Sequence, residues 1–153
     1  MLKKIYNKVT HEWDTSVEEA LKSFIRLPAL SPDFDKKWEE NGVLLKALED
    51  AQAWAEKQGI KGLRCEIIKD DGFTPCLFVE VDATSDKKFE RSVFFYGHLD
   101  KQPPNEGWDP DKSAWEPVIQ NGRLYGRGAV DDGYAFYTSL AAVKALQTLG
   151  IPH

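Results

Sequence analysis

The stretch FFYGHLDKQPP (residues 94–104) joins a run of large apolar side chains to a proline-rich loop. Because residues 93–96 are all apolar, the pattern predicts a strand over Ser92–Tyr96 that is covered on both faces, as central strands of α/β sheets are. His98 and Asp100 follow just past its carboxyl end. Ligands of open α/β sheets bind outside the carboxyl ends of strands, so the stretch predicts both a fold class and the place of a site.

Three helical segments are expected around this strand. Apolar residues recur at the spacing of one helical face over 11–27, and a proline follows. A second helical pattern runs over 31–59, with a serine as N-cap and a proline at the first helical position. It forms either one helix or two, because helix propensity falls at Asn41-Gly42. The third helix is expected over 133–149.

Two hairpins complete the set of expected elements. Segments 63–69 and 75–82 flank an Asp-Asp-Gly turn, and segment 118–128 is centred on Asn121-Gly122. The order of helices, strands and a final helix predicts an α/β layered domain with a mixed sheet flanked by helices. A length of 153 residues suits one domain.

Composition excludes several classes of function. Twenty basic and 25 acidic residues give a net charge of −5, without a lysine or arginine stripe that could follow a phosphate backbone. The amino terminus has no continuous apolar segment of the kind found in signal peptides or membrane spans. We therefore expect no nucleic-acid partner, no membrane association and a cytoplasmic location.

Two groups of residues could carry chemistry. A metal-binding histidine needs an acceptor for its second ring nitrogen, and Asp100 is near enough in sequence to serve His98 in this way. Asp131 and Asp132 directly precede the last helix, where one aspartate could act as an N-cap but two adjacent carboxylates repel one another. Each group alone also fits an ordinary loop histidine or a helix cap.

The combined motifs are more specific than either group. Gly-His-x-Asp, Trp-Asp-Pro and Gly-Arg-Gly-x-x-Asp-Asp occur in this order in "GHLDKQPP…GWDP…NGRLYGRGAVDD", with 131 − 98 = 33 positions from His98 to Asp131. This arrangement resembles the zinc-dependent metallopeptidase family of aminoacylases, carnosinase-like dipeptidases and carboxypeptidase G. A metallophosphoesterase, by contrast, is not indicated, because neither Gly-Asp-x-His nor Gly-Asn-His is present.

The resemblance implies a two-metal site. His98 would bind one zinc ion, Asp131 would bridge both ions, and Asp100 would act in catalysis by orienting His98; cobalt and manganese are alternative metals. Paired divalent ions polarise a scissile carbonyl and acidify a water molecule, so the implied reaction is hydrolysis of dipeptides or N-acyl amino acids. Relatives typically hold the bond between Asp131 and Asp132 in the cis form.

The chain also departs from the family pattern. Gly133-Tyr134 stands where many relatives have Lys-Gly, and the family supplies its catalytic Glu, an adjacent Glu ligand, a further acidic ligand and a second His from segments downstream. We do not expect His11 or His153 to replace them. Residues 1–153 are therefore expected to be an incomplete, amino-terminal portion of a metallopeptidase catalytic domain, inactive alone and prone to self-association. The alternative is a natural truncated homologue that binds a partner or metal without catalysis.

Overall fold

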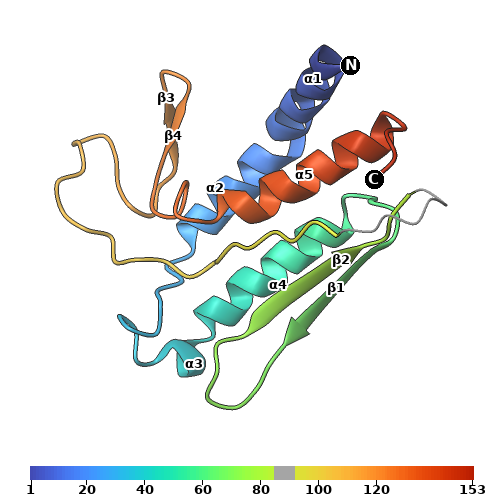
Figure 1. Cartoon of the computed structure of the whole chain (residues 1–153). Helices are drawn as coiled ribbons and strands as arrows, with labels where there is room; N and C mark the ends of the chain where they lie inside the picture. Colours follow the sequence, from blue (N-terminus) through green and yellow to red (C-terminus); the bar gives the residue numbers. More distant parts are fainter. Residues whose placement is uncertain (85–91) are drawn as a thin grey trace.

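The computed structural model describes residues 1–84 and 92–153 and is drawn in Figure 1. Helical elements come first along the chain, followed by two hairpins and a last helix. In order they are α1 (Leu2–Glu12), the π-helical turn η1 (Trp13–Val17), α2 (Glu18–Arg26), α3 (Trp38–Asn41), α4 (Val43–Glu56), β1 (Leu63–Ile68), β2 (Cys76–Val81), β3 (Val118–Gln120), β4 (Arg123–Tyr125) and α5 (Tyr134–Thr148). No helix of the described residues is long and apolar enough to cross a membrane.

The helical predictions hold for α5 and need correction elsewhere. The first helical region begins at Leu2 and not at residue 11. The second forms two helices, because Gly42 takes a left-handed φ of 67° between α3 and α4. Ser31 is not an N-cap: the chain forms turns after it, and the helix starts only at Trp38.

Both hairpins form where the sequence predicts them. β1 and β2 pair antiparallel from Leu63 opposite Val81 to Ile68 opposite Cys76, and α4 packs against them (Figure 1). β3 and β4 are joined by Asn121 and Gly122, whose φ values of 53° and 73° suit the tight turn of a two-residue hairpin. Local turn chemistry therefore accounts for the register of β3 and β4.

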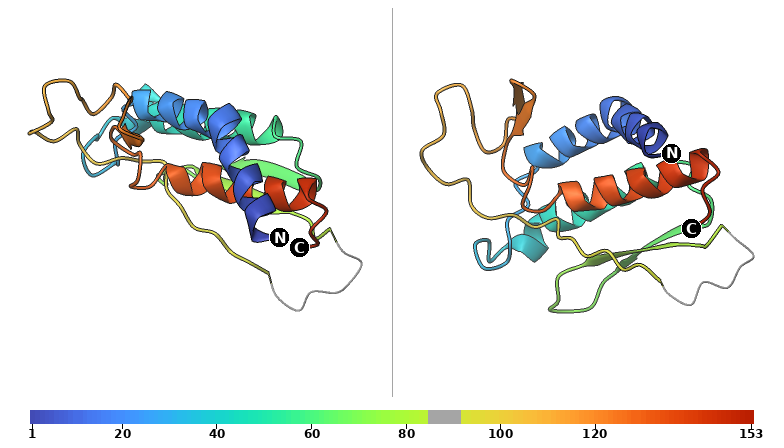
Figure 2. Two further views of the ribbon diagram at one scale, coloured as in Figure 1. Left: turned by 90° about the horizontal axis from the view of Figure 1, so that it is seen from above. Right: turned by 45° about the horizontal axis from the view of Figure 1, so that its top comes forward.

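The expected central strand over Ser92–Tyr96 is wrong for the chain as described. Both sheets of the described residues are two-stranded and antiparallel, so the mixed sheet is not observed there. The segment is a coil (Figure 2), and its four apolar side chains, at positions 93–96, are 60–82% exposed. A central strand needs hydrogen-bonding neighbours on both sides, and the described residues provide only one parallel bridge nearby, between Leu30 and Lys101.

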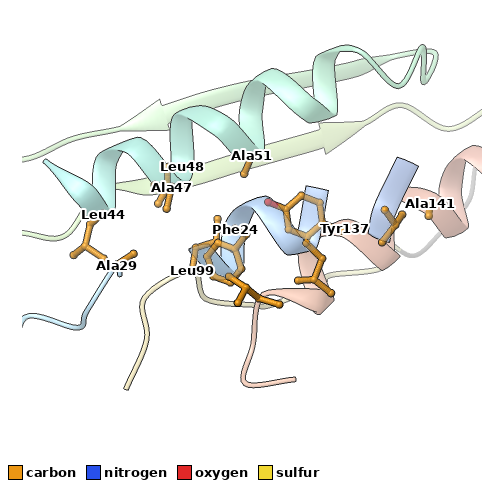
Figure 3. Packing of buried hydrophobic residues seen from close by; sticks show 12 residues of the cluster. Phe24, Ala29, Leu44, Ala47, Leu48, Ala51, Leu99, Tyr137 and Ala141 are labelled. Carbon is orange, nitrogen blue, oxygen red and sulfur yellow. The ribbon is translucent and has the colours of Figure 1, made fainter. Parts of the chain in front are cut away.

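The core lies between α2, α4 and α5 (Figure 3). Phe24 of α2 and Tyr137 of α5 are both almost completely buried, and the Tyr137 ring meets Trp54 of α4 edge-on with centroids 4.9 Å apart. Leu99 belongs to the same cluster, although it follows the exposed coil directly. The segment that carries His98 is therefore anchored in the core immediately after the histidine.

A buried carboxylate joins α1 to α5. Glu12 is 3% exposed, and its two oxygens lie 2.7 Å from Nζ of Lys8 and 2.7 Å from Nζ of Lys144. Burial by itself raises the pKa of Glu12, but the hydrogen bonds and charges of both lysines outweigh it and hold the pKa below 4.5. The ion pair to Lys144 thus links α1 to α5.

We predict that Glu12→Gln destabilises the protein at neutral pH by about 1–3 kcal/mol, because two partly buried ammonium groups lose their counter-charge. A carboxyl with a lowered folded-state pKa contributes stability above its unfolded pKa and loses it as the pH falls through the folded pKa. Urea unfolding from pH 7 to pH 3 should therefore show a shallower acid-induced loss in Glu12→Gln. Exposed Glu49→Gln serves as the control, and an unchanged acid dependence in Glu12→Gln would contradict the prediction.

Candidate metal centre

His98 is held by contacts on both sides of its ring and at its backbone. Its Nδ1 lies 3.0 Å from the carbonyl oxygen and 3.1 Å from Oδ1 of Asp100. Its backbone N–H donates to Oδ2 of Asp132 over 3.3 Å. His98 and Asp100 are each about one third exposed in their side chains, so the centre lies at the surface.

The predicted ligands His98 and Asp131 are brought together. Nε2 of His98 lies 3.2 Å from Oδ1 of Asp131. The carbonyl oxygen of Asp100 can only accept, so Nδ1 must carry the proton. In the neutral ring, Nε2 then presents a lone pair to a carboxylate oxygen, and this arrangement is favourable only if a proton or a metal cation lies between the two atoms.

Neighbouring charges favour a positive charge at His98. Burial lowers its pKa, but the hydrogen bond to the Asp100 carbonyl and the negative charges of Asp100, Asp131 and Asp132 outweigh this effect and raise the pKa above 6.5. The same field would attract a metal cation. The nearby carboxylates and the contact with Asp131 therefore both favour a positive charge at Nε2.

The spacing of the two atoms also fits zinc. Bonds of about 2.1 Å at tetrahedral angles separate neighbouring ligand atoms by about 3.4 Å, close to the 3.2 Å between Nε2 of His98 and Oδ1 of Asp131. Asp131 is 61% exposed in its side chain, which leaves its carboxylate accessible. Within residues 1–84 and 92–153, however, no group of three or more His, Cys, Asp or Glu side chains gathers at a metal-binding distance.

Asp132 does not cap the last helix. The N-cap of α5 is Gly133, and no side chain caps it. The Asp132 carboxylate instead accepts the hydrogen bond from the His98 backbone, a role that sequence reasoning missed because nothing local signals it. The expected cis bond between Asp131 and Asp132 is confirmed.

Three glycines let the loop that carries Asp131 approach α2 closely. A Cβ atom at Gly133 would overlap the ring of Phe24, and one at Gly128 would lie 2.8 Å from Cε of Lys101. A Cβ at Gly126 would lie 2.5 Å from Cγ2 of Ile25. The glycine at position 133 is therefore required by the packing of this core.

The other two histidines lie on different elements. His11 is exposed in α1 and forms no ion pair or side-chain hydrogen bond within the described part of the chain. His153 is hydrogen-bonded to Thr84: its carbonyl accepts from the Thr84 backbone N–H over 2.8 Å, and its Nδ1 lies 3.1 Å from the Thr84 hydroxyl. Neither contact brings a carboxylate or thiol to the imidazole.

Comparison with known proteins agrees with this centre. Residues 94–153 match the model of peptidase family M20/M25/M40, and the matched part contains His98, Asp100 and Asp131. Residues 94–153 are thus similar to the M20 peptidase family. The expected resemblance to zinc-dependent metallopeptidases is thus confirmed.

Individual M20 relatives include several hydrolases. The chain is 30% identical over 129 residues to a succinyl-diaminopimelate desuccinylase of Nautilia profundicola, covering 84% of this chain and 29% of the relative. It is 37% identical over 78 residues to a Beta-Ala-His dipeptidase of Mus musculus (48% and 15%). It is 36% identical over 64 residues to a Cys-Gly metallodipeptidase of Schizosaccharomyces pombe (40% and 13%). The chain thus spans less than a third of each of these relatives.

We predict that Gly133→Ala lowers the free energy of unfolding by about 1–3 kcal/mol, because the new methyl group overpacks against the Phe24 ring. Combining it with Phe24→Leu should recover part of that loss, and a double-mutant cycle from denaturant unfolding measures the coupling. Gly122→Ala is the control: it has open space around its Cβ position and should not couple to Phe24→Leu. Additive effects of Gly133→Ala and Phe24→Leu would show that the contact does not constrain the loop.

Proposed function

We propose that residues 1–153 form the amino-terminal portion of the catalytic domain of a dinuclear zinc hydrolase that cleaves amide bonds in dipeptides or N-acyl amino acids. The observation that carries this proposal is that Nε2 of His98 faces Oδ1 of Asp131 over 3.2 Å, with the proton held on Nδ1. The family match of residues 94–153 and the dipeptidases among the similar proteins support the reaction class.

Each of the three site residues has a separate task in this proposal. His98 would hold one metal ion through Nε2, and Asp131 would be a ligand shared by that ion and a second one. Asp100 fixes the tautomer and orientation of the His98 ring through Nδ1. Bound zinc supplies Lewis acidity, which polarises a scissile carbonyl and activates water near neutral pH; cobalt and manganese are alternatives.

The proposal does not extend to activity of this chain alone. His98 and Asp131 provide two donor atoms, whereas zinc sites normally have three or four protein ligands. The resemblance assigns the general base and the remaining ligands to downstream segments, and general acid–base catalysis contributes about 10²–10⁴-fold to typical rates. We therefore propose that chain 1–153 is catalytically inactive by itself.

A non-catalytic homologue that binds a partner or a metal is the second candidate function. The observation that favours it is the exposed apolar coil at 93–96, an uncharged surface suited to another protein. This candidate differs from the first in one measurable respect. If the protein is a non-catalytic homologue, no assembled form of it hydrolyses a substrate.

Location and partners complete the proposal. Cys65 and Cys76 are both free thiols, as is usual in the reducing cytoplasm. The substrate is a small peptide or an N-acyl amino acid, and the net charge of −5 disfavours nucleic acid. We propose a cytoplasmic enzyme without membrane or nucleic-acid partners.

We predict that chain 1–153 binds zinc weakly at His98 and hydrolyses neither dipeptides nor N-acyl amino acids. In a zinc titration followed by NMR, the ring signals of His98 should shift, and His98→Ala or Asp131→Ala should abolish the response at this site. His11→Ala is the matched control and should leave the response intact. A tight stoichiometric zinc site, or zinc-dependent turnover that Asp131→Ala abolishes, would contradict the prediction.

We also predict concentration-dependent self-association through the coil at 93–96. This uncharged segment exposes four apolar side chains, and pairing with the same segment of a second copy would cover them and supply backbone hydrogen bonds. Sedimentation equilibrium should show dimers or larger species that Phe94→Lys reduces. Tyr6→Lys, at an exposed aromatic residue of α1, is the control. A monomer at high concentration would disprove this prediction.

A further inference from the structure

Lys101 is the most deeply buried charged side chain in the described residues, with 1% exposure. Its Nζ donates to three backbone carbonyl oxygens at the end of α2. They belong to Phe24 (2.6 Å), Ile25 (3.2 Å) and Leu27 (2.6 Å). Nζ also lies 3.9 Å from the centre of the Phe24 ring.

The end of α2 is suited to an ammonium group. The last carbonyls of a helix lack intrahelical partners and carry the negative end of the helix dipole. Burial lowers the pKa of Lys101 to about 7, whereas the three carbonyls and the aromatic face favour the ammonium form, the only form with a hydrogen for each acceptor. A buried cation so fully paired fixes the position of its side chain.

The main chain of Lys101 is fixed as well. Its N–H donates to the Ala29 carbonyl over 2.8 Å, and its carbonyl accepts from the N–H of Ser31 over 2.9 Å. Leu99, two residues earlier, is anchored in the core. The short segment from Leu99 to Lys101 is therefore immobilised, and Asp100, which orients the His98 ring, lies inside it.

The loop that carries Asp131 rests on the same side chain. Gly128 packs against the stem of Lys101 so closely that a Cβ there would lie 2.8 Å from Cε. The Gly128 carbonyl in turn accepts a hydrogen bond from the N–H of Gly133 over 3.1 Å, which closes the loop around Asp131. One lysine thus contacts both segments of the candidate centre without reaching the metal donor atoms itself.

We propose that Lys101 is a positioning residue. By fixing both segments to the end of α2, it places His98 Nε2 opposite Asp131 Oδ1. Only the predicted effect of Lys101 on metal affinity rests on the proposed function. The positioning of the His98 ring is a property of the metal-free chain.

The test uses Lys101→Met, which keeps the length of the stem and removes the three donors. The first readout is the ¹⁵N spectrum of the imidazole rings without metal. At a pH where the ring is neutral, wild type should show the Nδ1–H form of His98, and Lys101→Met should show the tautomer mixture of a free imidazole. The second readout is zinc affinity at His98, which should fall about tenfold or more, the usual effect of losing a group that orients a ligand.

A control variant separates positioning from stability. Leu140→Ala truncates a buried side chain of the second core cluster, away from Lys101, and should lower the melting temperature without changing the His98 spectrum. If both variants lower stability and neither changes the His98 tautomer or zinc affinity, the positioning role is overturned. If Lys101→Met does not fold, Lys101→Gln, which keeps an amide donor, is measured instead and should give an intermediate tautomer population; a wild-type spectrum for it overturns the proposal.

The two proposals fail in different ways. A wild-type chain that shows the Nδ1–H form of His98 but no zinc response would remove the proposed metal function and leave the positioning role intact. A zinc response that is equal in wild type and Lys101→Met, with unchanged tautomers, would keep the metal site and remove the role of Lys101.

Discussion

The ammonium group of Lys101 at the end of α2 is the constraint on which the rest of the candidate centre depends. A charge buried to this degree is tolerated only with complete pairing, and the three carbonyls of Phe24, Ile25 and Leu27 provide it. Pro28 cannot continue the helix, so these carbonyls stay within reach of Nζ, although those of Phe24 and Leu27 also accept one backbone N–H each. Lys101 therefore brings three segments together: the end of α2, its own segment after the exposed coil, and the loop that contains Gly128.

This junction explains how weakly structured segments can hold an ordered site. The residues before His98 form an exposed coil, and the loop before α5 has no regular secondary structure. Order is supplied instead by Leu99 in the core, by the backbone bonds of Lys101 and by the contact between Gly128 and the lysine stem. The result is a histidine lone pair facing a carboxylate, an arrangement that is stable only with a cation between them.

The sequence predicted the elements that depend on local signals and missed those that depend on distant ones. The hairpin at Asn121-Gly122 follows from turn chemistry, and α5 lies where the last helix was expected. The strand at 92–96 failed because a strand forms only beside neighbours, and the described residues do not supply them. The proximity of His98 and Asp131 was expected only from the family resemblance. The roles of Lys101 and Asp132 rest on contacts with residues 76 and 34 positions away, and no local pattern reports them.

Core packing determines the residue that follows Asp131-Asp132, and the contact between Asp131 and His98 is kept. Phe24 fills the space that a side chain at 133 would need, and the same ring covers the Lys101 ammonium. A side chain at 133 is therefore incompatible with this position of Phe24, the ring that covers the Lys101 ammonium. Nε2 of His98 and Oδ1 of Asp131 still lie 3.2 Å apart with glycine at 133, so the packing at the end of α2 accounts for this residue.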